Sequence, residues 1–565
     1  MKYYLGLSGW HNRGHDASAA LIGVQGDEVK IIGAVEEERF TGNRYALNEL
    51  PRHALSWCLQ QVPGGAELND MDGIAFSWNW PLIYENRKVA YEEDRMLLDS
   101  MFDKANLDRL QFINHHKCHA ASAYYPSGYE DAAIIVMDGQ GEQESGSVWK
   151  AAGGGINLIA TFNIAASLGY LYQAASSFVG LGTAHAGKTM GLSSYGLPIY
   201  ADELNEQFSL NGAELSLRKY NISECNYSFG TLDEEEQMVF YWLKYFTHLC
   251  KVPPNALRKD YDFTNFPKPY ADLAASVQKT TSDLLLKLVR NVQDLTQCDN
   301  LCLAGGSFLN CMANGQIANS GLFKNIFIQP AANDAGAALG AAFLLAGERQ
   351  YVLKDRFTPL LGPEYSSEEI MKQLAGQGIP YKFKESFTRE ISQFVLQGQT
   401  VGLFQGKMEF GPRALGNRSI IASPSARGMR EHVNKKIKRR ENGRPFGPSI
   451  IEDDVSAVFG DALINEHMTI SQEVQASALT EIIHVDGTTR PNLVTRDTNP
   501  LYYSQLKAIK EATGYGVVIN TSLNCDGPIV NTPLQACELL NKTALNHIVF
   551  NNQILVSQSA LKESM

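Results

Sequence analysis

Short apolar runs that end abruptly in glycine and aspartate are the feature that most constrains this sequence. Residues 132–137 end in Asp138-Gly139, and residues 300–303 lead into Gly305-Gly306. Such runs are typical of buried strands, and α/β folds place ligands where strands end in glycine turns. At the start of the chain, alternating apolar runs and glycine turns predict a β-meander at the edge of such a domain, with strands at residues 3–8, 17–24 and 29–35. The sequence therefore predicts a mixed α/β fold.

The chain is too long for a single hydrophobic core. It has 565 residues, whereas one domain usually has about 100–200. A stretch with Gly362-Pro363, at about residues 351–366, is typical of a linker. We predict one domain at residues 1–355, with a partly helical insertion at about 200–270, and a second domain at residues 356–565.

Composition favours a cytoplasmic protein that binds neither membranes nor nucleic acid. No apolar run reaches the roughly 20 residues that cross a bilayer, and residues 1–10 lack the basic leader of a signal peptide. The nine cysteines are scattered and contain no Cys-x-x-Cys pair, so a disulfide framework or a cysteine zinc site is not expected. The net charge of −12 opposes a broad nucleic-acid interface.

Two histidines with metal-ligand spacing open a helical run. His115 and His119 stand four residues apart, so both imidazoles leave the same face of a helix. Asp138 follows a predicted strand, and Asp334 lies in residues 330–336. Two imidazoles and two carboxylates make a mixed site suited to zinc or ferrous iron, with a position left for substrate. The alternative is a capped helix end or a solvated patch for the histidines, and turn or capping roles for the aspartates.

Several glycines and one asparagine are candidates for binding a nucleotide. Residues 305–306, Gly336 and Gly340 permit close backbone approach to a ligand, although helix–strand packing accounts for them equally well. Asn310 could hydrogen-bond a ribose or a base.

Two further residues have both a chemical and a structural interpretation. His15, beside Asp16 in a predicted turn, is either a general base near neutral pH or a buried structural histidine. Arg39, which follows three glutamates, is either a phosphate clamp or one half of a surface ion pair.

Cations and amides in the C-terminal half predict a polyanion pocket. Two arginines lie five residues apart in the glycine-punctuated residues 406–419, and residues 435–444 are strongly basic. Arginine offers a fork that matches phosphate, and lysine offers a mobile point charge. The alternative for residues 435–444 is a solvated basic helix face. The candidate phosphate-binding residues are Arg413, Arg418, Lys438, Arg444, Asn520 and Ser522.

Five motifs resemble, in order and spacing, those of the O-carbamoyltransferases of natural-product and nodulation-factor biosynthesis, the NodU and TobZ type. The resemblance covers essentially the whole chain. It implies a TsaD-like, actin-like ATPase (ASKHA) fold for the N-terminal domain and a YrdC-like α/β fold from about residue 364 to the end. The motifs are His15-Asp16-Ala17-Ser18-Ala19-Ala20, Glu36-Glu37-Glu38-Arg39-Phe40, His115-His116-Lys117-Cys118-His119, Asp138-Gly139-Gln140-Gly141-Glu142 and Gly187-Lys188-Thr189-Met190-Gly191-Leu192.

The resemblance also implies a reaction and its site residues. ATP and carbamoyl phosphate would form carbamoyl-adenylate in the C-terminal domain, and the carbamoyl group would then pass to a hydroxyl of a small molecule. His15 and His115 would be catalytic, iron would be the expected metal, and Mg²⁺ could accompany ATP. The metal ligands would be His115, His119, Asp138 and Asp334. Nucleotide contacts would come from Arg39, Gly169, Gly306 and Asn310, and the second pocket from Arg413, Lys438, Arg444, Arg490, Asn520 and Ser522.

Three positions depart from the family pattern: Lys407 replaces an arginine, Leu523 a phenylalanine and Gly527 a glutamate. Lys407 keeps its charge but loses bidentate recognition of phosphate. The family leads us to expect a homodimer, and no motif identifies the acceptor. Two rival functions share parts of the pattern: a tRNA threonylcarbamoyl-adenosine-type enzyme, which the acidic charge opposes, and a non-catalytic actin-like ATPase switch.

Overall fold

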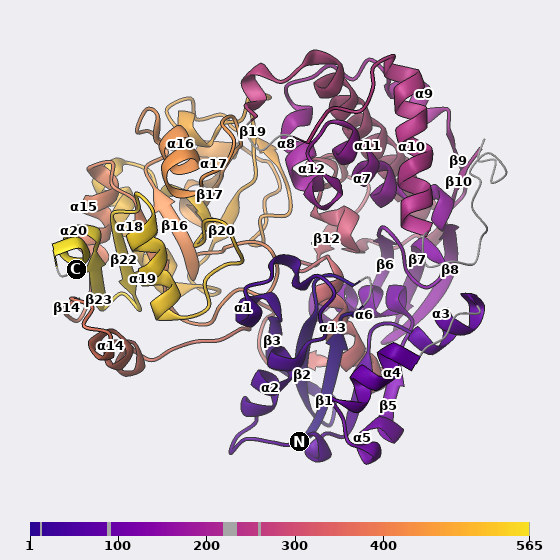
Figure 1. The fold of residues 1–565 in the computed structure, drawn as a ribbon, viewed down its shortest axis with the longest axis horizontal. Helices are drawn as coiled ribbons and strands as arrows, with labels where there is room; N and C mark the ends of the chain where they lie inside the picture. Colours follow the sequence, from indigo (N-terminus) through magenta and orange to yellow (C-terminus); the bar gives the residue numbers. More distant parts are fainter. Residues whose placement is uncertain (12–13, 88–91, 219–233, 258–260, 564–565) are drawn as a thin grey trace. The chain divides into compact units, whose positions relative to one another are not determined.

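The computed structural model describes residues 1–11, 14–87, 92–218, 234–257 and 261–563. The chain forms two compact units. The first consists of residues 1–41, 45–259 and 265–357, and the second of residues 42–44, 260–264 and 358–565. Each unit is described by itself (Figure 1).

The first unit contains two sheets with the same strand order. In each, three antiparallel strands (β3-β2-β1 and β8-β7-β6) continue into two parallel ones (β4-β5 and β11-β12), and β13 adds to the edge of the first sheet at β3. This topological repeat is not visible in the sequence. The strands are β1 (Lys2–Ser8), β2 (Ser18–Gln25), β3 (Glu28–Glu36), β4 (Gly73–Phe76), β5 (Leu110–Phe112), β6 (Asp131–Met137), β7 (Glu144–Ala152), β8 (Gly155–Asn163), β11 (Asn300–Ala304), β12 (Asn325–Ile328) and β13 (Val352–Leu353).

The predicted N-terminal meander is confirmed. The three expected strands coincide with β1, β2 and β3, which pair antiparallel from Lys2 opposite Val24 to Ser18 opposite Glu36. The two runs that end in glycine turns are β6 and β11, which lie side by side and parallel. Their carboxyl ends therefore meet at one edge of the sheet, where an α/β fold places its ligand.

Two helices, α6 (His115–Ser127) and α13 (Asp334–Leu345), pack against each other within the first unit (Figure 1). Helix α13 also covers β1 and β2, and α6 covers β6 and β11. A Cβ atom at Gly340 would lie 1.8 Å from the carbonyl oxygen of Cys118, and one at Gly336 would lie 2.1 Å from that of Ala331. These two glycines therefore serve backbone packing, which was the alternative to nucleotide contact.

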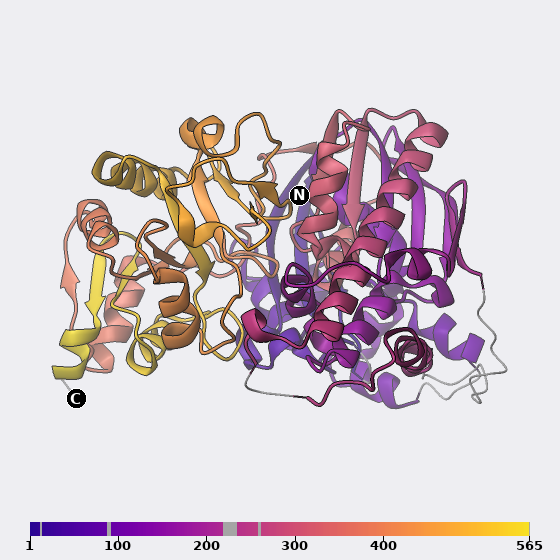
Figure 2. The ribbon, with the colours of Figure 1, turned by 90° about the horizontal axis from the view of Figure 1, so that it is seen from above.

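Among the other helices of the first unit, α2 packs on β2 and β3, whereas α7 to α12 pack mainly on one another. The 29-residue α11 packs against α7, α8, α9 and α12 (Figures 1 and 2). These helices are α1 (Glu38–Thr41), α2 (Arg52–Gln60), α3 (Trp80–Arg87), α4 (Glu92–Asp99), α5 (Lys104–Arg109), α7 (Leu168–Phe178), α8 (Ala186–Ser193), α9 (Ala201–Asn205), α10 (Glu234–Cys250), α11 (Lys268–Thr296) and α12 (Cys311–Asn319).

The predicted insertion at about 200–270 contains α9, α10 and the hairpin of β9 (Phe208–Asn211) and β10 (Glu214–Leu217) in its described part. Its residues 219–233 and 258–260 lie outside the described residues, as does Cys225. The eight described cysteines are free thiols, and all except the half-buried Cys525 are buried.

The second unit is built on one eight-stranded sheet with helices on both faces. Neighbouring residues on a strand point to opposite faces, so Leu403 packs with α15 and α18 whereas Phe404 packs with α14 and α19. The strand order is β14 (Lys382–Phe383), β23 (Ile554–Ser557), β22 (His547–Phe550), β15 (Val401–Phe404), β16 (Arg418–Ala422), β21 (Val517–Ser522), β17 (Gly447–Ile451) and β20 (Asn492–Val494). The helices are α14 (Ser367–Gly376), α15 (Thr388–Leu396), α16 (Met429–His432), α17 (Val455–Phe459), α18 (Pro500–Thr513), α19 (Pro533–Lys542) and α20 (Gln558–Glu563). Two short strands, β18 (Gln472–Glu473) and β19 (Thr488–Thr489), pair antiparallel outside the main sheet.

The mixed α/β class is confirmed, and the finer TsaD-like and YrdC-like assignments stay predictions. Among the described residues, none of the helices has both the length and the apolar character needed to cross a bilayer.

Candidate active site

Four predicted metal ligands meet in the first unit. His115 and His119 lie one turn apart on α6, Asp138 directly follows β6, and Asp334 is the first residue of α13. All four side chains are buried, and each offers a ligand atom within 4.8 Å of the other three. The expected spacing on one helix face is therefore realised, and strand and helix ends supply the carboxylates.

The separations fit a central divalent ion. The two Nε2 atoms lie 3.1 Å apart. His115 Nε2 lies 3.6 Å from Asp138 Oδ2 and 3.5 Å from Asp334 Oδ1, and His119 Nε2 lies 3.2 and 3.8 Å from the same two oxygens. Metal–ligand bonds of about 2.1 Å would place neighbouring ligand atoms about 3.0–3.4 Å apart. The buried Asp138 Oδ2 makes no well-formed hydrogen bond with a described residue, so the donor set and this orphaned oxygen both suit a cation.

Surrounding groups orient the first histidine. His115 Nδ1 lies 3.0 Å from the carbonyl oxygen of Ser77, so Nδ1–H donates there and Nε2 keeps its lone pair for a metal. The indole of Trp78 stacks on the His115 ring with centroids 3.7 Å apart. A Cβ at Gly306 would lie 3.1 Å from Asp138 Oδ1, so glycine leaves space beside this carboxylate.

The four groups strongly perturb one another's ionisation. Burial opposes charge on His115, but Asp334 and Asp138 raise the pKa of its imidazole to about 10. Burial also opposes charge on Asp138 and Asp334, yet the histidines hold the pKa values of both carboxyls below their ordinary range. The cluster therefore attracts positive charge, either as a proton or as a cation.

His15 carries its own carboxylate partner. Its Nδ1 lies 2.9 Å from Asp16 Oδ2, and the side chain is 45% exposed. Desolvation opposes protonation of His15, but the charges of Asp334 and Asp16 raise its pKa above the ordinary value. Because the side chain is partly exposed, water weakens both the desolvation and the charge interactions. With Nδ1–H donated to Asp16, Nε2 is the atom left to accept a proton.

Two glutamates beside the cluster were not recognised in the sequence as site residues. Glu142 and Glu144 lie in and just after the turn that carries Asp138, and both contact the start of α6. Burial raises the pKa of Glu142 to about 7. The sequence signals were their closeness to Asp138 and, for Glu142, its place in the family motif of residues 138–142. The contacts with α6 depend on tertiary packing.

Most of the residues expected to contact the nucleotide are already engaged. Arg39 is buried and lies 2.9 Å from Glu36 Oε1 and 2.8 Å from Glu38 Oε1, so it is not part of a surface ion pair. A Cβ at Gly169 would lie 2.7 Å from the Cα of Gly139, so this glycine packs α7 on the turn after β6.

Asn310 caps α12 and pairs with a residue that the sequence did not indicate. Its Oδ1 accepts from Ala313 N, and its Nδ2 donates to Gln278 Oε1 at 3.0 Å. Tyr172 donates to the same Gln278 oxygen at 2.7 Å. A buried amide network therefore holds Asn310.

The second unit brings several basic side chains close together, two of which were not expected. Arg440 Nε donates to Asn434 Oδ1 at 2.7 Å, and Asn434 Nδ2 donates to the carbonyl of Arg444 at 2.9 Å. The main chain of Arg490 packs on Gly447. Burial and the charges of Arg444, Arg490 and Arg44 lower the pKa of Arg440 well below its ordinary value. We call Arg44, Lys438, Arg440, Arg444 and Arg490 the cation cluster; Arg44 and Arg440 were not among the expected site residues.

Lys438 and the amides of β21 are tightly hydrogen-bonded. Lys438 Nζ donates to the carbonyl oxygen and Oγ of Ser522 at 2.7 and 3.1 Å, and to Asn524 Oδ1. Asn520 Nδ2 donates to the carbonyl of Ala414 at 2.9 Å, next to Arg413, and its buried Oδ1 has no partner among the described residues. Burial and Arg440 lower the pKa of Lys438.

The prediction that Arg418 belongs to the pocket is wrong. It is fully buried, and it donates to the carbonyls of Gln405 and Pro363 at 3.0 Å, with its guanidinium 3.6 Å from the Phe404 ring centroid. The same loop is held by Glu409 Oε1, which accepts from the backbone N–H groups of Leu415, Asn417 and Arg418 at 2.8, 2.9 and 3.1 Å.

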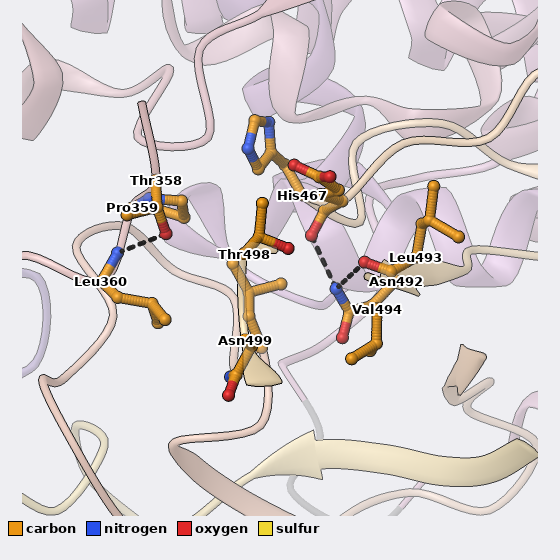
Figure 3. Close-up of a pocket in the computed structure, with 11 residues that line it drawn as sticks. Thr358, Pro359, Leu360, His467, Asn492, Leu493, Val494, Thr498 and Asn499 are labelled. Carbon is orange, nitrogen blue, oxygen red and sulfur yellow. Dashed lines mark hydrogen bonds between the residues drawn. The ribbon is translucent and has the colours of Figure 1, made fainter. Parts of the chain in front are cut away.

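A small cavity of about 20 Å³ lies elsewhere in the second unit (Figure 3). Such a volume holds about one water molecule. Asn492 Nδ2 donates across its wall to the carbonyl oxygen of Glu466 at 2.6 Å. The cavity is therefore too small for a substrate.

Known proteins resemble both halves of the chain. The family model "Carbamoyltransferase N-terminus" matches residues 83–343, and "Carbamoyltransferase C-terminus" matches residues 392–557. An uncharacterized protein of Synechocystis sp. is 33% identical to this chain, and the match covers 98% of this chain and 97% of the length of that protein. Nodulation protein NolNO of Sinorhizobium fredii is 30% identical over 97% of this chain and 80% of its own. The 3'-hydroxymethylcephem-O-carbamoyltransferase of Streptomyces clavuligerus is 32% identical over 42% of this chain and 44% of its own. The chain therefore belongs to the carbamoyltransferase family, as a relative of the nodulation-type members.

Proposed function

We propose that this protein is an ATP-dependent O-carbamoyltransferase that makes carbamoyl-adenylate in its second unit and transfers the carbamoyl group in its first. The observation that carries the proposal is the match of carbamoyltransferase family models to both halves of the chain. Each half also has a charged cluster of the kind its step needs: cations for phosphates, and an imidazole–carboxylate set for a metal.

In the second unit, the cation cluster binds the phosphates of carbamoyl phosphate and ATP. Burial and the neighbouring arginines lower the pKa of Arg440, and phosphate oxygens would stabilise its charged form. Carbamoyl phosphate gives carbamate and phosphate with one water, and the carbamate oxygen then attacks the α-phosphorus of ATP and displaces pyrophosphate. The fixed guanidinium groups stabilise the charge on both leaving groups.

Lys438, Ser522 and Asn520 shape this pocket. The Lys438 ammonium fixes the residues after β21 through its three contacts with Ser522 and Asn524. Asn520 ties β21 to the backbone beside Arg413. We assign Arg413, Arg444 and Arg490 to phosphate contact, and Lys438, Asn520 and Ser522 to support of the pocket. Arg444 Nη1 also lies 2.8 Å from Glu441 Oε1.

In the first unit, an acceptor hydroxyl attacks the carbonyl carbon of carbamoyl-adenylate, and AMP leaves. His15, oriented by Asp16, takes the hydroxyl proton on Nε2. His115, His119, Asp138 and Asp334 would hold a divalent ion, with iron expected. Such an ion would polarise the carbamoyl carbonyl and offset part of the carboxylate charge that raises the pKa of His15.

Four residues of the first unit are assigned to the nucleotide. Gly306 faces the Asp138 carboxylate directly, with no side chain to exclude a ligand. Arg39, Gly169 and Asn310 act through the segments they hold, because their own contacts are with the protein.

Product analysis without an acceptor tests the proposal. The purified protein is incubated with ATP and carbamoyl phosphate, and AMP, ADP, pyrophosphate and phosphate are followed. We expect pyrophosphate only when carbamoyl phosphate is present, and at least a tenfold lower rate for Arg444→Ala. Release of ADP, or the same nucleotide products without carbamoyl phosphate, would contradict the proposal and favour an ATPase switch.

A further inference from the structure

The turn between β6 and β7 carries a second buried carboxylate, four residues after Asp138. Glu142 is 4% exposed. The turn is closed by hydrogen bonds from Gly141 N to the carbonyl of Glu144 at 2.6 Å and from Asp138 N to that of Ser145 at 2.9 Å. One short turn therefore fixes the positions of both Asp138 and the Glu142 carboxylate.

The Glu142 carboxylate accepts hydrogen bonds from two other segments of the first unit. Its Oε1 accepts from Asn79 N and His115 N, each at 2.9 Å. Its Oε2 accepts from Asn114 Nδ2 at 2.7 Å and from His115 N at 3.1 Å. Asn114 caps α6, so the carboxylate lies against the positive end of that helix.

These contacts fix two of the features that orient the His115 imidazole, besides the stacked indole of Trp78. One is the backbone of His115 itself, held through its N–H. The other is the carbonyl of Ser77, which accepts from His115 Nδ1 and lies two residues before the Asn79 N–H held by Glu142. A shift of either would rotate Nε2 away from Asp138 and Asp334.

We propose that Glu142 is a positioning residue that holds His115, through its backbone and through the Asn79 segment, in the geometry that binds a divalent cation. The inference rests on the proposed metal site of the first unit. The groups that hydrogen-bond to the Glu142 carboxylate are backbone and amide donors, and Glu142 is not one of the four residues whose ligand atoms converge. Outer partners of this kind commonly change metal affinity by about 10–100-fold.

Glu144 provides a matched control. It lies two residues further on, is also largely buried, and accepts from the same Asn114 Nδ2 at 3.0 Å. It also accepts from Gln143 N at 2.9 Å and lies 4.0 Å from His116 Nδ1, and none of these contacts involves the backbone of His115. A change at Glu144 therefore disturbs the same network without releasing the first ligand.

The test is Co²⁺ binding by the full-length protein after chelator treatment, followed by calorimetry and by the visible absorption of the bound ion. In Glu142→Gln an amide NH₂ must face one of the donors, and we expect Kd to rise about 10–100-fold. For Glu144→Gln we expect a change below about threefold. A Glu142→Gln protein that folds and binds Co²⁺ like the unaltered protein would overturn the inference, as would equal losses in both variants.

A second variant covers the case in which Glu142→Gln does not fold. Asn114→Ser keeps a capping oxygen for α6 but removes the Nδ2 donor to Glu142. We expect a threefold to tenfold weaker Co²⁺ affinity, and unchanged affinity would overturn the inference. If the unaltered protein bound no Co²⁺, the metal site of the proposed function would itself be refuted, a result distinct from failure at Glu142 alone.

Discussion

Gly340→Ala should destabilise the protein, although alanine normally favours a helix. At an open helical position this change stabilises by about 0.5–1 kcal/mol. At Gly340 the new Cβ would lie 1.8 Å from the carbonyl oxygen and 2.7 Å from the carbonyl carbon of Cys118. Ordinary contact needs roughly 3.3 Å or more, so α13 and α6 must separate by about 1.5 Å. Overpacking of this kind costs about 1–3 kcal/mol, and the helix gain offsets only part of it.

The same displacement should weaken metal binding. Cys118 lies between His115 and His119 on α6, and Asp334 begins the helix that contains Gly340. Metal sites tolerate ligand shifts of only about 0.2 Å. We therefore expect Co²⁺ affinity to fall at least tenfold, together with a melting temperature lower by roughly 2–6 °C.

The assay combines thermal melting with Co²⁺ titration of the full-length protein. Gly376→Ala is the control, because Gly376 ends α14 and a Cβ added there would have no atom of another segment within 4 Å. We expect the control to keep its metal affinity and to melt at the same or a slightly higher temperature. A Gly340→Ala protein that melts and binds like the unaltered one would refute the reasoning, since the helices would then have no need of close contact.

Three further changes test other parts of the account. Asp334→Asn removes a charged ligand oxygen, and calorimetry should give a Co²⁺ Kd at least about tenfold higher; an unchanged Kd would remove this residue from the site. Arg440→Ala removes one member of the cation cluster, so ATP affinity measured by calorimetry should fall, with a shallower dependence on salt; unchanged affinity and salt dependence would place the anion site elsewhere. His547 donates to Gln399 Oε1 at 2.9 Å, and burial together with Lys382 lowers its pKa to about 4. Neutral His547 therefore contributes to the free energy of unfolding above pH 6.5, and this contribution is lost as the pH falls through 4. The loss is about 2 kcal/mol after allowance for the partial exposure of the side chain. In urea unfolding, His547→Gln should lose less stability than the unaltered protein between pH 7 and pH 4, and an unchanged pH dependence would contradict this.

Local patterns predicted the main elements, and they predicted that the side chains of His115, His119, Asp138 and Asp334 would converge. The spacing of His115 and His119 needs only helical geometry, and Asp138 needs only a strand that ends. The β-meander followed from alternation of apolar residues and glycine turns. These features depend on neighbours within a few residues, which a sequence displays directly.

The roles of individual cations and glycines could not be predicted in the same way. Arg413 and Arg418 have similar sequence surroundings, yet Arg418 is buried among backbone carbonyls. Gly169 and Gly340 meet backbone atoms from distant segments rather than a ligand. Glu142 gained its contacts only when α6 and the turn after β6 came together. Each depends on tertiary packing, for which local sequence carries no signal.

Formation of carbamoyl-adenylate is the most direct test of the central claim. The full-length protein is incubated with ATP and carbamoyl phosphate labelled with ¹³C at the carbonyl, without an acceptor, and the quenched mixture is resolved by mass spectrometry. We expect an AMP derivative that carries the labelled carbamoyl group and whose formation depends on both substrates. Label found only in carbamate or bicarbonate, with ATP intact or converted to ADP, would contradict it.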